Sequence, residues 1–351
     1  MLKVAIVGAG GYTGSELVRL VHRHPELSLE VVIARDNAGK RLDQVLPSTL
    51  GVRGLGERVL ESFEPSQAAE LAKRVDVAFL CLPHAASARA GKALYEAGVR
   101  VVDLSADFRL KSRETYEKTY GPHPAPELFE YAVYGLPELH RRELAGAKLI
   151  AAPGCYPTSC ILPLAPLLRE RLIETKGIII DSKSGVSGAG KTPGAAFHLP
   201  EAAEGIRPYK VAGAHRHTPE IEQELSLAAG EPVQVVFTPH LAPMSRGILS
   251  VAYARLLPGK TAEDCRKAAR ALYQDGLVTV LEDGVLPDTL WVRGSARAHV
   301  AYALDVRTST VIAMGTIDNL AKGASAQALQ ALNVAMGWAD ATGLPEVAQF
   351  P

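Results

Sequence analysis

The sequence predicts an α/β protein of two domains, and three observations carry that prediction. Short apolar runs and helix-like segments alternate through the first 150 residues, whereas later apolar runs follow one another with few long helices between them. The 351 residues are enough for two domains, each with its own core. We therefore expect a doubly wound α/β domain over 1–150 plus 318–351, and an α+β domain with a mixed or antiparallel sheet over 151–317.

The first domain alternates strands and helices in order along the chain. Residues 3–7 form a β-branched apolar run that stops at glycine, and residues 13–24 follow with apolar positions at helical spacing. Further strands are expected at 29–34, 75–82 and 99–105, with a helix at 86–98. These strands are apolar almost throughout, which is typical of a parallel sheet that is covered on both faces.

The second domain carries the remaining strands. We expect them at 233–242, 247–257, 297–306 and 309–317, because these runs alternate or stay apolar with few helices between them. Residues 318–337 then show apolar positions near helical spacing. They predict a long helix that returns to pack on the first domain.

Composition excludes several classes of partner. Lys plus Arg equals Asp plus Glu at 38 each, so a nucleic-acid partner is not expected. No apolar run approaches the roughly 20 residues that cross a bilayer, and the start of the chain lacks the pattern of a signal peptide. We expect a cytoplasmic protein that does not bind membranes. Its four cysteines are too few for a disulfide scaffold and match no zinc spacing, so no metal is expected.

A glycine-rich loop stands between the first strand and the first helix. Gly8, Gly11 and Gly14 form G-x-x-G-x-x-G, whereas counting from Gly8 and Gly10 puts Thr13 in the third place. Either way, glycine permits a tight turn, close helix–strand packing and approach of backbone N–H groups to a pyrophosphate. A purely structural turn is the alternative. We favour a Rossmann-type dinucleotide site in which the loop contacts the cofactor through Gly8, Gly10, Gly11, Tyr12, Thr13 and Gly14.

The end of the second strand bears on the choice of dinucleotide. Arg35 would pair with the 2′-phosphate of NADP, and Asp36 would accept a ribose hydroxyl of NAD. The two neighbours point in opposite directions, with a slight preference for NADP. Both side chains are also compatible with a solvated surface.

Cys155, in the segment IAAPGCYPTSC, has three interpretations. A disulfide with Cys160 is disfavoured by a reducing compartment and by a five-residue separation along a helix. Pro157 suits the first turn of a helix, so Cys155 would lie at or just before a helix N-terminus, where a thiolate is stabilised. From the residues alone, a packed thiol and a nucleophile are about equally well supported as interpretations of Cys155. Cys160 is expected to be a packing residue.

Two further clusters suit a reaction on an anionic substrate. His215 and His217 lie in a loop that enters a helix, close to Glu220, and a nucleophilic cysteine needs such an acid or base. Arg109 follows a strand of the first domain, and Lys191 belongs to the glycine-rich segment 183–194, which could hold a phosphate or close over a cofactor. Surface histidines, a surface arginine and a simple hairpin are the alternatives.

Taken together, several blocks resemble the type 1 N-acetyl-γ-glutamyl-phosphate reductase family of the aspartate-semialdehyde dehydrogenase-like superfamily. The blocks are GAGGYTGSEL, DLSADFRL, YGLPEL, APGCYPTSC, SGVSGAGK, HRHTPEIEQEL, FTPHLAPMSRGIL and IDNLAKGASAQALQALN. They cover nearly the whole chain in order. The main departure is Ala9-Gly10, where many relatives have Ala-Ser.

The resemblance implies an NADPH-dependent reduction of N-acetyl-γ-glutamyl phosphate in arginine synthesis. Cys155 would form a thioester and His215 would act as acid or base, with its ordinary pKa suited to neutrality and His217 as the fallback. Glu220 would orient an imidazole or the substrate. The resemblance also implies cofactor contacts from Arg35, Ser184, Gly185, Gly188 and Asn319, and substrate or phosphate contacts from Arg109, Ser184, Lys191 and Arg246.

Other functions remain in competition. The nearest is the same chemistry on a carrier-protein-linked aminoadipyl phosphate in lysine synthesis, which shares these blocks. A non-catalytic NADP-sensing protein would keep the glycine loop and lose the chemistry, and a cysteine hydrolase leaves the loop unexplained. Members of the resembled family are typically homotetramers or homodimers, which is the assembly we expect.

Overall fold

The computed structural model describes residues 1–191, 193–274 and 276–350, which form two compact units. Unit 1 comprises Met1–Pro153 and Ala324–Leu344; unit 2 comprises Gly154–Gly323 and residues 345–350. The predicted domain ranges divide the chain at slightly different points, and residue 351, the last of the predicted range, lies outside the described residues. Residues 318–323 belong to unit 2 because Asp318 is bonded there, to the Arg246 side chain and the Gly294 N–H.

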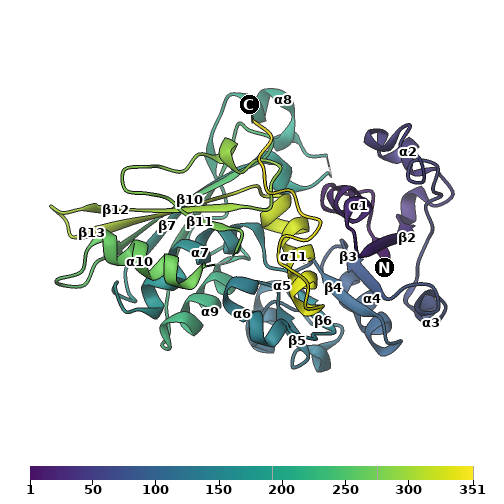
Figure 1. The fold of residues 1–351 in the computed structure, drawn as a ribbon, viewed down its shortest axis with the longest axis horizontal. Helices are drawn as coiled ribbons and strands as arrows, with labels where there is room; N and C mark the ends of the chain where they lie inside the picture. The colour runs from purple at the N-terminus through teal and green to yellow at the C-terminus, as the bar shows by residue number, and fades with distance from the viewer. Residues whose placement is uncertain (192, 275, 351) are drawn as a thin grey trace. The chain divides into compact units, whose positions relative to one another are not determined.

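The described part of unit 1 contains a parallel sheet with the strand order β2-β1-β3-β4-β6-β5 (Figure 1). Its strands are β1 (Leu2–Val7), β2 (Leu27–Ile33), β3 (Val77–Leu80), β4 (Arg100–Asp103), β5 (Ala132–Tyr134) and β6 (Leu149–Ala151). The order reverses at β1, which has β2 on one side and β3 on the other. Ligands of doubly wound sheets bind at such a switch point.

Helices cover both faces of this sheet. Ala5 and Val7 of β1 belong to a core cluster with residues of α3 (Ala68–Ala72) and α4 (Ala86–Glu96). Successive strand residues point to opposite faces, and the alternate residues Val4 and Ile6 are also fully buried. The remaining helices are α1 (Tyr12–Arg23), α2 (Leu42–Val45), α5 (Arg113–Tyr120), α6 (Pro137–Leu144) and α11 (Ala326–Ala335). The predicted α/β class with a Rossmann-type domain is confirmed.

A buried polar network follows β4 and explains the DLSADFRL block. Asp103 accepts hydrogen bonds from the hydroxyls of Ser87 and Ser105, both at 2.6 Å. Burial, and then the charge of Asp107, raises the pKa of Asp103 to about 6. Asp107 accepts the N–H groups of Ala85 and Ala88 at the start of α4. The network therefore fixes the chain that leads to Arg109.

The described part of unit 2 contains a mixed sheet with the order β11-β12-β13-β10-β7-β9-β8. The β7–β9 and β11–β12 pairs are parallel and the other pairs antiparallel. Its strands are β7 (Ile178–Gly185), β8 (Arg207–Pro208), β9 (Val235–Ala242), β10 (Ile248–Arg255), β11 (Val278–Val280), β12 (Ala298–Asp305) and β13 (Thr310–Ile317). The mixed sheet agrees with the sequence-based prediction for this part of the chain.

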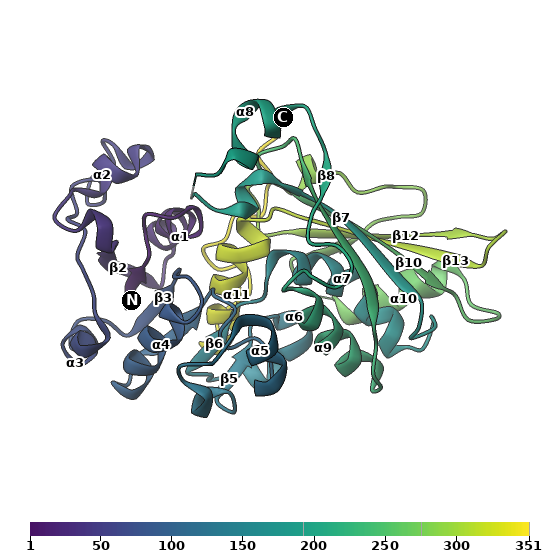
Figure 2. The ribbon, with the colours of Figure 1, turned by 180° about the vertical axis from the view of Figure 1, so that it is seen from behind.

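Helices cover one face of this sheet, and the other face carries exposed apolar side chains among the described residues. Figure 2 shows the covering helices, which are α7 (Cys155–Arg169), α9 (Thr218–Ala229) and α10 (Ala262–Leu272); the short α8 (Leu199–Ala203) is a further helix of this unit. The other face carries an apolar row at paired positions of four adjacent strands, which we call the open row: Val236, Ile179, Tyr253 and Ile312. Val236 is 58% exposed and Ile179 47% exposed.

The predicted single helix over 318–337 is shorter than expected. Residues 321–325 form a π-helical turn, called the π-turn below, and α11 begins at Ala326. The turn starts where the Asp318 carboxylate accepts the N–H groups of Leu320 and Ala321. Among the described residues, no helix combines the length and apolar character needed to cross a bilayer.

Candidate active site

The glycine loop of unit 1 is built around two glycines whose lack of a side chain is required. Gly8 has a φ of +93°, and a Cβ there would meet the carbonyl group of Cys81. A Cβ on Gly14 would meet the Gly8 carbonyl oxygen and lie 2.7 Å from the Cα of Ala9. Gly14, and not Thr13, therefore allows the close helix–strand packing that the fingerprint requires.

The N-terminus of α1 has the features that suit a bound anion. Gly11 is the N-cap residue, with no side chain that caps the helix and no acidic residue in the first turn. The first N–H groups of a helix lack intrahelical partners and carry partial positive charge. The predicted pyrophosphate position fits this geometry, because Gly10 and Gly11 would have no contact closer than 3.7 Å from an added Cβ.

Replacing Gly14 by alanine is expected to destabilise unit 1. The added methyl group cannot be placed without moving backbone atoms, so we expect the free energy of unfolding to fall by about 1–3 kcal/mol. Gly11→Ala is the matched control, since its nearest contact, the Gly8 carbonyl oxygen at 3.7 Å, is an ordinary one. Urea unfolding followed by circular dichroism measures both variants. Equal unfolding midpoints would contradict the packing role of Gly14.

Arg35 and Asp36 lie directly after β2 on the surface. Their side chains are 78% and 83% exposed and approach each other at 3.3 Å. The exposed guanidinium leaves room for the predicted contact with a 2′-phosphate. An exposed pair of this kind contributes little to stability.

Arg109 is buried and joins the carboxyl ends of two neighbouring strands. Its Nε donates to the carbonyl of Ala152 at 2.7 Å, and its Nη2 donates to the carbonyl of Leu104 at 2.8 Å. Leu104 follows β4 and Ala152 follows β6. Arg109 therefore fixes the chain three residues before Cys155, in addition to any contact with substrate.

Cys155 is the first residue of α7, with Gly154 as the N-cap. Its side chain is half-buried. Pro157 lies in the first turn, and the dipole of this 15-residue helix acts on the thiol at its N-terminus. This position stabilises a thiolate. The helix start at Cys155 is the one predicted from the sequence.

Two groups hold Cys155 in place. The Glu220 carboxylate is almost completely buried, and its Oε1 accepts the Gly154 N–H at 2.8 Å. Gly323 packs directly on the cysteine, since a Cβ on Gly323 would lie 2.9 Å from the Cβ of Cys155. Glu220 was expected to orient an imidazole or the substrate, and the structure adds a contact with the backbone just before Cys155.

His215 lies in an aromatic cluster rather than in solvent. Its ring packs edge-on against Tyr156 and Phe237, with centroids 5.4 Å apart, and against His217 at 4.9 Å. Its Nδ1 accepts the His217 N–H at 3.1 Å, which leaves Nε2 to carry the proton of the neutral ring. Burial, and then the charge of His217, lowers the pKa of His215 to about 3. The expectation of an ordinary histidine pKa is therefore wrong, because the sequence does not show this burial.

Two tyrosines that the sequence did not single out belong to the same cluster. The Tyr209 hydroxyl donates to that of Tyr156 at 3.2 Å, and the Tyr156 hydroxyl donates to the His240 carbonyl at 2.9 Å. Burial raises the pKa of Tyr209 to about 12 and raises that of Tyr156 further; the charge of Cys155 contributes to both. The two phenols are therefore neutral, and their hydroxyl protons are donated to the Tyr156 hydroxyl and to the His240 carbonyl. Their positions directly after Cys155 and six residues before His215 were the available signal.

The backbone that enters His215 is strained. Lys210 and Ala212 have φ values of +47° and +55°, which are unfavourable for residues with a side chain. Such strain persists only where the surrounding structure enforces it, and it concentrates at functional sites. This loop lies between Tyr209 and His215.

Several residues that the sequence analysis assigned to cofactor or substrate contacts lie together in unit 2. Asn319 accepts the Gly247 N–H at 2.7 Å and donates to the Ser187 hydroxyl at 2.8 Å. The Ser184 hydroxyl donates to the carbonyl of Gly185 at 3.1 Å. A Cβ on Gly188 would lie 3.2 Å from that hydroxyl. Lys191 is exposed on the same loop.

Arg246 is paired with a fully buried carboxylate. Its Nε lies 2.8 Å from Oδ2 of Asp318, and its Nη2 donates to Oδ1 at 3.0 Å. The positive charge of Arg246 is thus balanced within unit 2. Among the described residues, no group of three His, Cys, Asp or Glu side chains could hold a metal ion, so the His215–His217 pair lacks the further ligands of a metal site.

Comparisons with known proteins decide the family. Residues 3–147 match the semialdehyde dehydrogenase NAD binding domain, and residues 155–319 match the semialdehyde dehydrogenase dimerisation domain. N-acetyl-gamma-glutamyl-phosphate reductases of Pelobacter propionicus and Geobacter sulfurreducens are 48% and 49% identical to this chain over the full length of both chains. That of Magnetococcus marinus is 47% identical over 100% of this chain and 99% of its own.

The chain belongs to the N-acetyl-gamma-glutamyl-phosphate reductase family. The resemblance drawn from the sequence blocks is confirmed.

Comparison with solved structures shows the fold alone, because their sequence identities to this chain are low. Aspartate semialdehyde dehydrogenase II of Vibrio cholerae matches with a TM-score of 0.71 at 17% identity, over 96% of this chain and 98% of that one. The aspartate semialdehyde dehydrogenase of Candida albicans with NADP matches with a TM-score of 0.68 at 16% identity, over 97% and 99%.

The remaining cysteines are unsuited to the role of a nucleophile in a reductase of this family. Cys160 is fully buried beside the hydroxyls of Ser182 and Ser250, and burial raises the pKa of its thiol. Burial also raises the pKa of Cys265 to about 12 and that of Cys81 further still. All four cysteines are free thiols, so the expected packing role of Cys160 agrees with the structure.

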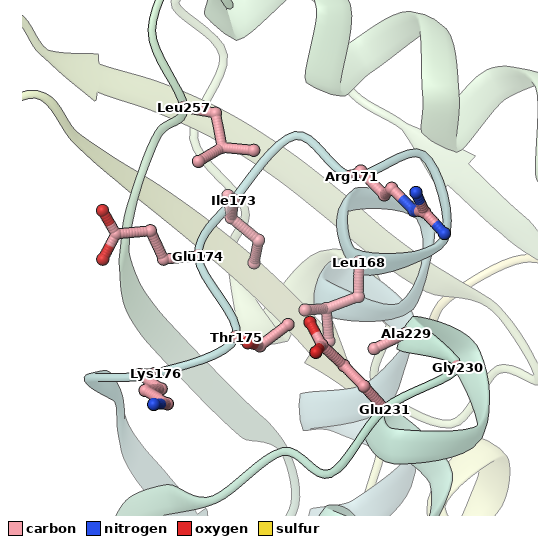
Figure 3. Close-up of a pocket in the computed structure, with 10 residues that line it drawn as sticks. All are labelled: Leu168, Arg171, Ile173, Glu174, Thr175, Lys176, Ala229, Gly230, Glu231 and Leu257. Atoms are coloured by element: carbon pink, nitrogen blue, oxygen red, sulfur yellow. The ribbon is translucent and has the colours of Figure 1, made fainter.

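A pocket elsewhere in unit 2 does not offer a reaction centre for this family. Figure 3 shows this pocket of about 620 Å³ at the ends of α7 and α9, where Leu168 and Ala229 line it. Cys155 begins α7, and a rise of 1.5 Å per residue puts the two ends of that helix about 20 Å apart. The charged groups of Arg171 and Glu174 point away from each other, so they do not converge on a ligand.

Proposed function

We propose that this chain reduces N-acetyl-γ-glutamyl phosphate to N-acetylglutamate 5-semialdehyde and phosphate, with NADPH as the hydride donor and a thioester on Cys155. The observation that carries the proposal is the position of Cys155 at the N-terminus of α7. Cys160 and Cys265 are buried, whereas Cys155 and Cys81 are partly exposed. Of these two, Cys81 has a raised pKa, so its thiol stays protonated. Relatives at 46–49% identity carry this activity in their names. We propose that the enzyme works in the cytoplasm.

The chemistry has two stages. The Cys155 thiolate attacks the γ-carbonyl carbon, a C–S bond forms, and the C–O bond to phosphate breaks with its electron pair leaving on the phosphate. NADPH, when bound, supplies the hydride that reduces the thioester carbonyl. The resulting thiohemiacetal releases the aldehyde and returns the thiolate, with one proton exchanged at the oxygen. The thioester accepts hydride where a carboxylate would not.

His215 is the group we assign to the oxygen of these intermediates. The ring is neutral at physiological pH, with the proton on Nε2, so it donates a hydrogen bond to developing negative charge. The ring keeps that proton throughout, because a neutral imidazole that lost it would become an imidazolate, so the proton taken up by the oxygen comes from water. His217 is the fallback for this role. The phenols of Tyr156 and Tyr209 are neutral members of the same cluster and donate within it.

The glycine loop is proposed to hold the pyrophosphate of NADPH. Gly8 and Gly14 keep the turn compact, and Gly10, Gly11, Tyr12 and Thr13 present the start of α1. Arg35 would pair with the 2′-phosphate. Ser184, Gly185, Gly188 and Asn319 are proposed to contact the nicotinamide side of the cofactor.

Among the cations, Arg109 is the stronger candidate for the substrate phosphate. Its guanidinium is held at the carboxyl ends of β4 and β6 by bonds to backbone carbonyls, and the ligands of such a sheet bind at that edge, whereas the guanidinium of Arg246 is paired with Asp318. Lys191 on its exposed loop would add a cation, and Ser184 would add a hydroxyl. Arg246 is proposed to act mainly by holding Asp318.

An assay in the reverse direction tests the activity. N-acetylglutamate semialdehyde, phosphate and NADP are mixed with the enzyme, and NADPH formation is followed by absorbance. We expect turnover that requires phosphate and that falls when NAD replaces NADP. Parallel assays with the carrier-linked aminoadipyl substrate decide between the two acyl phosphates. Absence of turnover with both would contradict the proposed function, and binding of NADP without turnover would favour the sensing protein.

We propose that the protein is a homo-oligomer, a dimer or a tetramer, assembled through the open face of the unit 2 sheet. The open row presents apolar side chains across four adjacent strands, and this part of the chain matches the dimerisation domain of the family. Burying such a row on a second copy removes apolar surface from water.

Replacing Ile179 by glutamate is expected to dissociate the oligomer. The charge would be placed in the middle of the proposed contact, where it would lose water without gaining a partner. Size-exclusion chromatography with light scattering measures the mass. Arg307→Glu, on an exposed turn, is the control for added acidic charge. An unchanged mass for Ile179→Glu would contradict this assembly.

A further inference from the structure

The π-turn joins the candidate site to the rest of the chain in an unusual way. Its residues Ala321–Ser325 have π-helical hydrogen bonding, with the Gly323 N–H bonded to the Asp318 carbonyl five residues earlier at 2.8 Å. π-helical turns are rare and are found frequently at functional sites. The chain passes from unit 2 to unit 1 inside this turn, between Gly323 and Ala324.

On its unit 2 side, the π-turn limits where Cys155 can lie. An added Cβ on Gly323 would come within 2.9 Å of the Cys155 Cβ, 3.2 Å of the Asp318 carbonyl oxygen and 3.2 Å of an Ile317 methyl group. The Asp318 oxygen belongs to the backbone, the Cys155 Cβ is bonded directly to its own backbone, and the Ile317 methyl group is packed. None of the three atoms can move away easily to admit a methyl group on residue 323. Glycine is therefore required by close approach and not by its φ angle.

On its unit 1 side, the π-turn is tied to the glycine loop. The Ser325 hydroxyl, fully buried, donates to the Thr13 carbonyl at 2.9 Å. Thr13 lies in the first turn of α1, next to Gly14. A shift of the first turn of α1 therefore pulls on Ser325, which is two residues from Gly323.

We propose that Gly323 and Ser325 are positioning residues for Cys155. Gly323 sets the position of the thiol, and Ser325 transmits the state of the glycine loop to it through the π-turn. A pyrophosphate held at the start of α1 would thus change the reactivity of Cys155. The inference rests on the proposed function in one respect, that the glycine loop binds the dinucleotide.

Alkylation of Cys155 tests the proposal without any turnover. The full-length protein is treated with iodoacetamide, and modification of the Cys155 peptide is followed over time by mass spectrometry. The probe is 2′-phospho-ADP-ribose, which carries the pyrophosphate but no nicotinamide ring to shield the thiol. Its binding is measured by calorimetry, so that each variant is compared at saturation.

For Ser325, we expect the saturating probe to change the Cys155 alkylation rate of the unsubstituted protein by about fivefold. Ser325→Ala should abolish this change while still binding the probe. Ser295→Ala is the matched control, because Ser295 is also fully buried and donates to a backbone carbonyl, that of Val292. It should keep the change.

For Gly323, we expect Gly323→Ala to alter the alkylation rate without probe by about tenfold or more, because displacement of a reacting group by about 1 Å has effects of this size. Gly205→Ala, where an added Cβ meets nothing within 4 Å, should leave the rate unchanged. A normal rate in Gly323→Ala would overturn the role of Gly323.

The outcomes separate this inference from the proposed function. If the probe binds and the rate does not change, or if Ser325→Ala keeps the full change, the coupling is overturned and the reductase proposal stands. If the probe does not bind at all, the cofactor proposal and the coupling fall together. A reductase assay that fails while alkylation responds as described overturns only the proposed reaction.

Discussion

Replacing Cys155 by serine is expected to lower the turnover of the reductase by at least about 10³-fold, as the loss of a covalent nucleophile does in other enzymes. A serine hydroxyl at the start of α7 stays protonated at neutral pH and does not form the acyl intermediate at a useful rate. NADP binding, measured by fluorescence or calorimetry, should be unchanged because the glycine loop is untouched. The rate is measured in the phosphate-dependent assay.

Cys160→Ser is the matched control for this substitution. Cys160 is five positions along the same helix, and the hydroxyls of Ser159, Ser182 and Ser250 around it can accept a further hydroxyl. Its thiol is fully buried and takes no part in the proposed chemistry. We expect turnover close to that of the unsubstituted protein. Full turnover in Cys155→Ser, or an equal loss in both variants, would remove Cys155 as the nucleophile.

The second large effect is expected for His215→Asn, which should lower turnover by about 10²–10³-fold, the range for loss of a hydrogen-bond donor to a developing oxyanion. Asparagine keeps an oxygen that can accept the His217 N–H, so the loop has a replacement for the Nδ1 contact. It lacks the Nε2 proton donor. The KM for the semialdehyde should change much less than kcat.

The pH dependence of the unsubstituted protein sharpens the test. Because the pKa of His215 is about 3 in the folded protein, the ring is neutral throughout the neutral range, and the rate profile there should show no titration of His215. The unfolded chain has the ordinary value of 6.5, so it binds the proton more readily. The contribution of His215 to stability is therefore present above about pH 6.5 and is lost as the pH falls toward 3.

Parallel substitutions assign the role between the two histidines. His217→Asn should cost less turnover than His215→Asn, and exposed His22→Asn should cost nothing. A larger loss in His217→Asn would transfer the assignment to His217. A stability that does not depend on the presence of His215 between pH 6.5 and 4 would contradict its burial as a neutral ring.

Much of the fold followed from local patterns in the sequence. Continuous apolar strands around β1 and β3 identified a parallel sheet, because such runs are typical of strands that are buried on both faces. The glycine triplet at Gly8–Gly14 was recognised from its position between a strand and a helix. The sequence did not show whether Gly14 or Thr13 is the third residue of the fingerprint, because that depends on how α1 packs against Ala9.

The parts of the site that escaped prediction depend on contacts between distant segments. Nothing around Gly323 in the sequence shows that it lies on Cys155, and nothing near His215 shows the aromatic cluster that keeps its ring neutral. Arg109 was recognised as a cation, but its bonds to Ala152 and Leu104 required the sheet to be formed. Glu220 was placed near the site, and its partner, the Gly154 N–H, was not foreseen.

The acyl-enzyme itself is the most direct test of the account. The protein is mixed with N-acetyl-γ-glutamyl phosphate without NADPH, quenched in acid, and examined by intact-mass and peptide-mapping mass spectrometry. We predict a mass increase equal to one N-acetylglutamyl group, located on the peptide that contains Cys155 and released when NADPH is added before the quench. An unmodified Cys155, or the acyl group on another residue, would contradict the account.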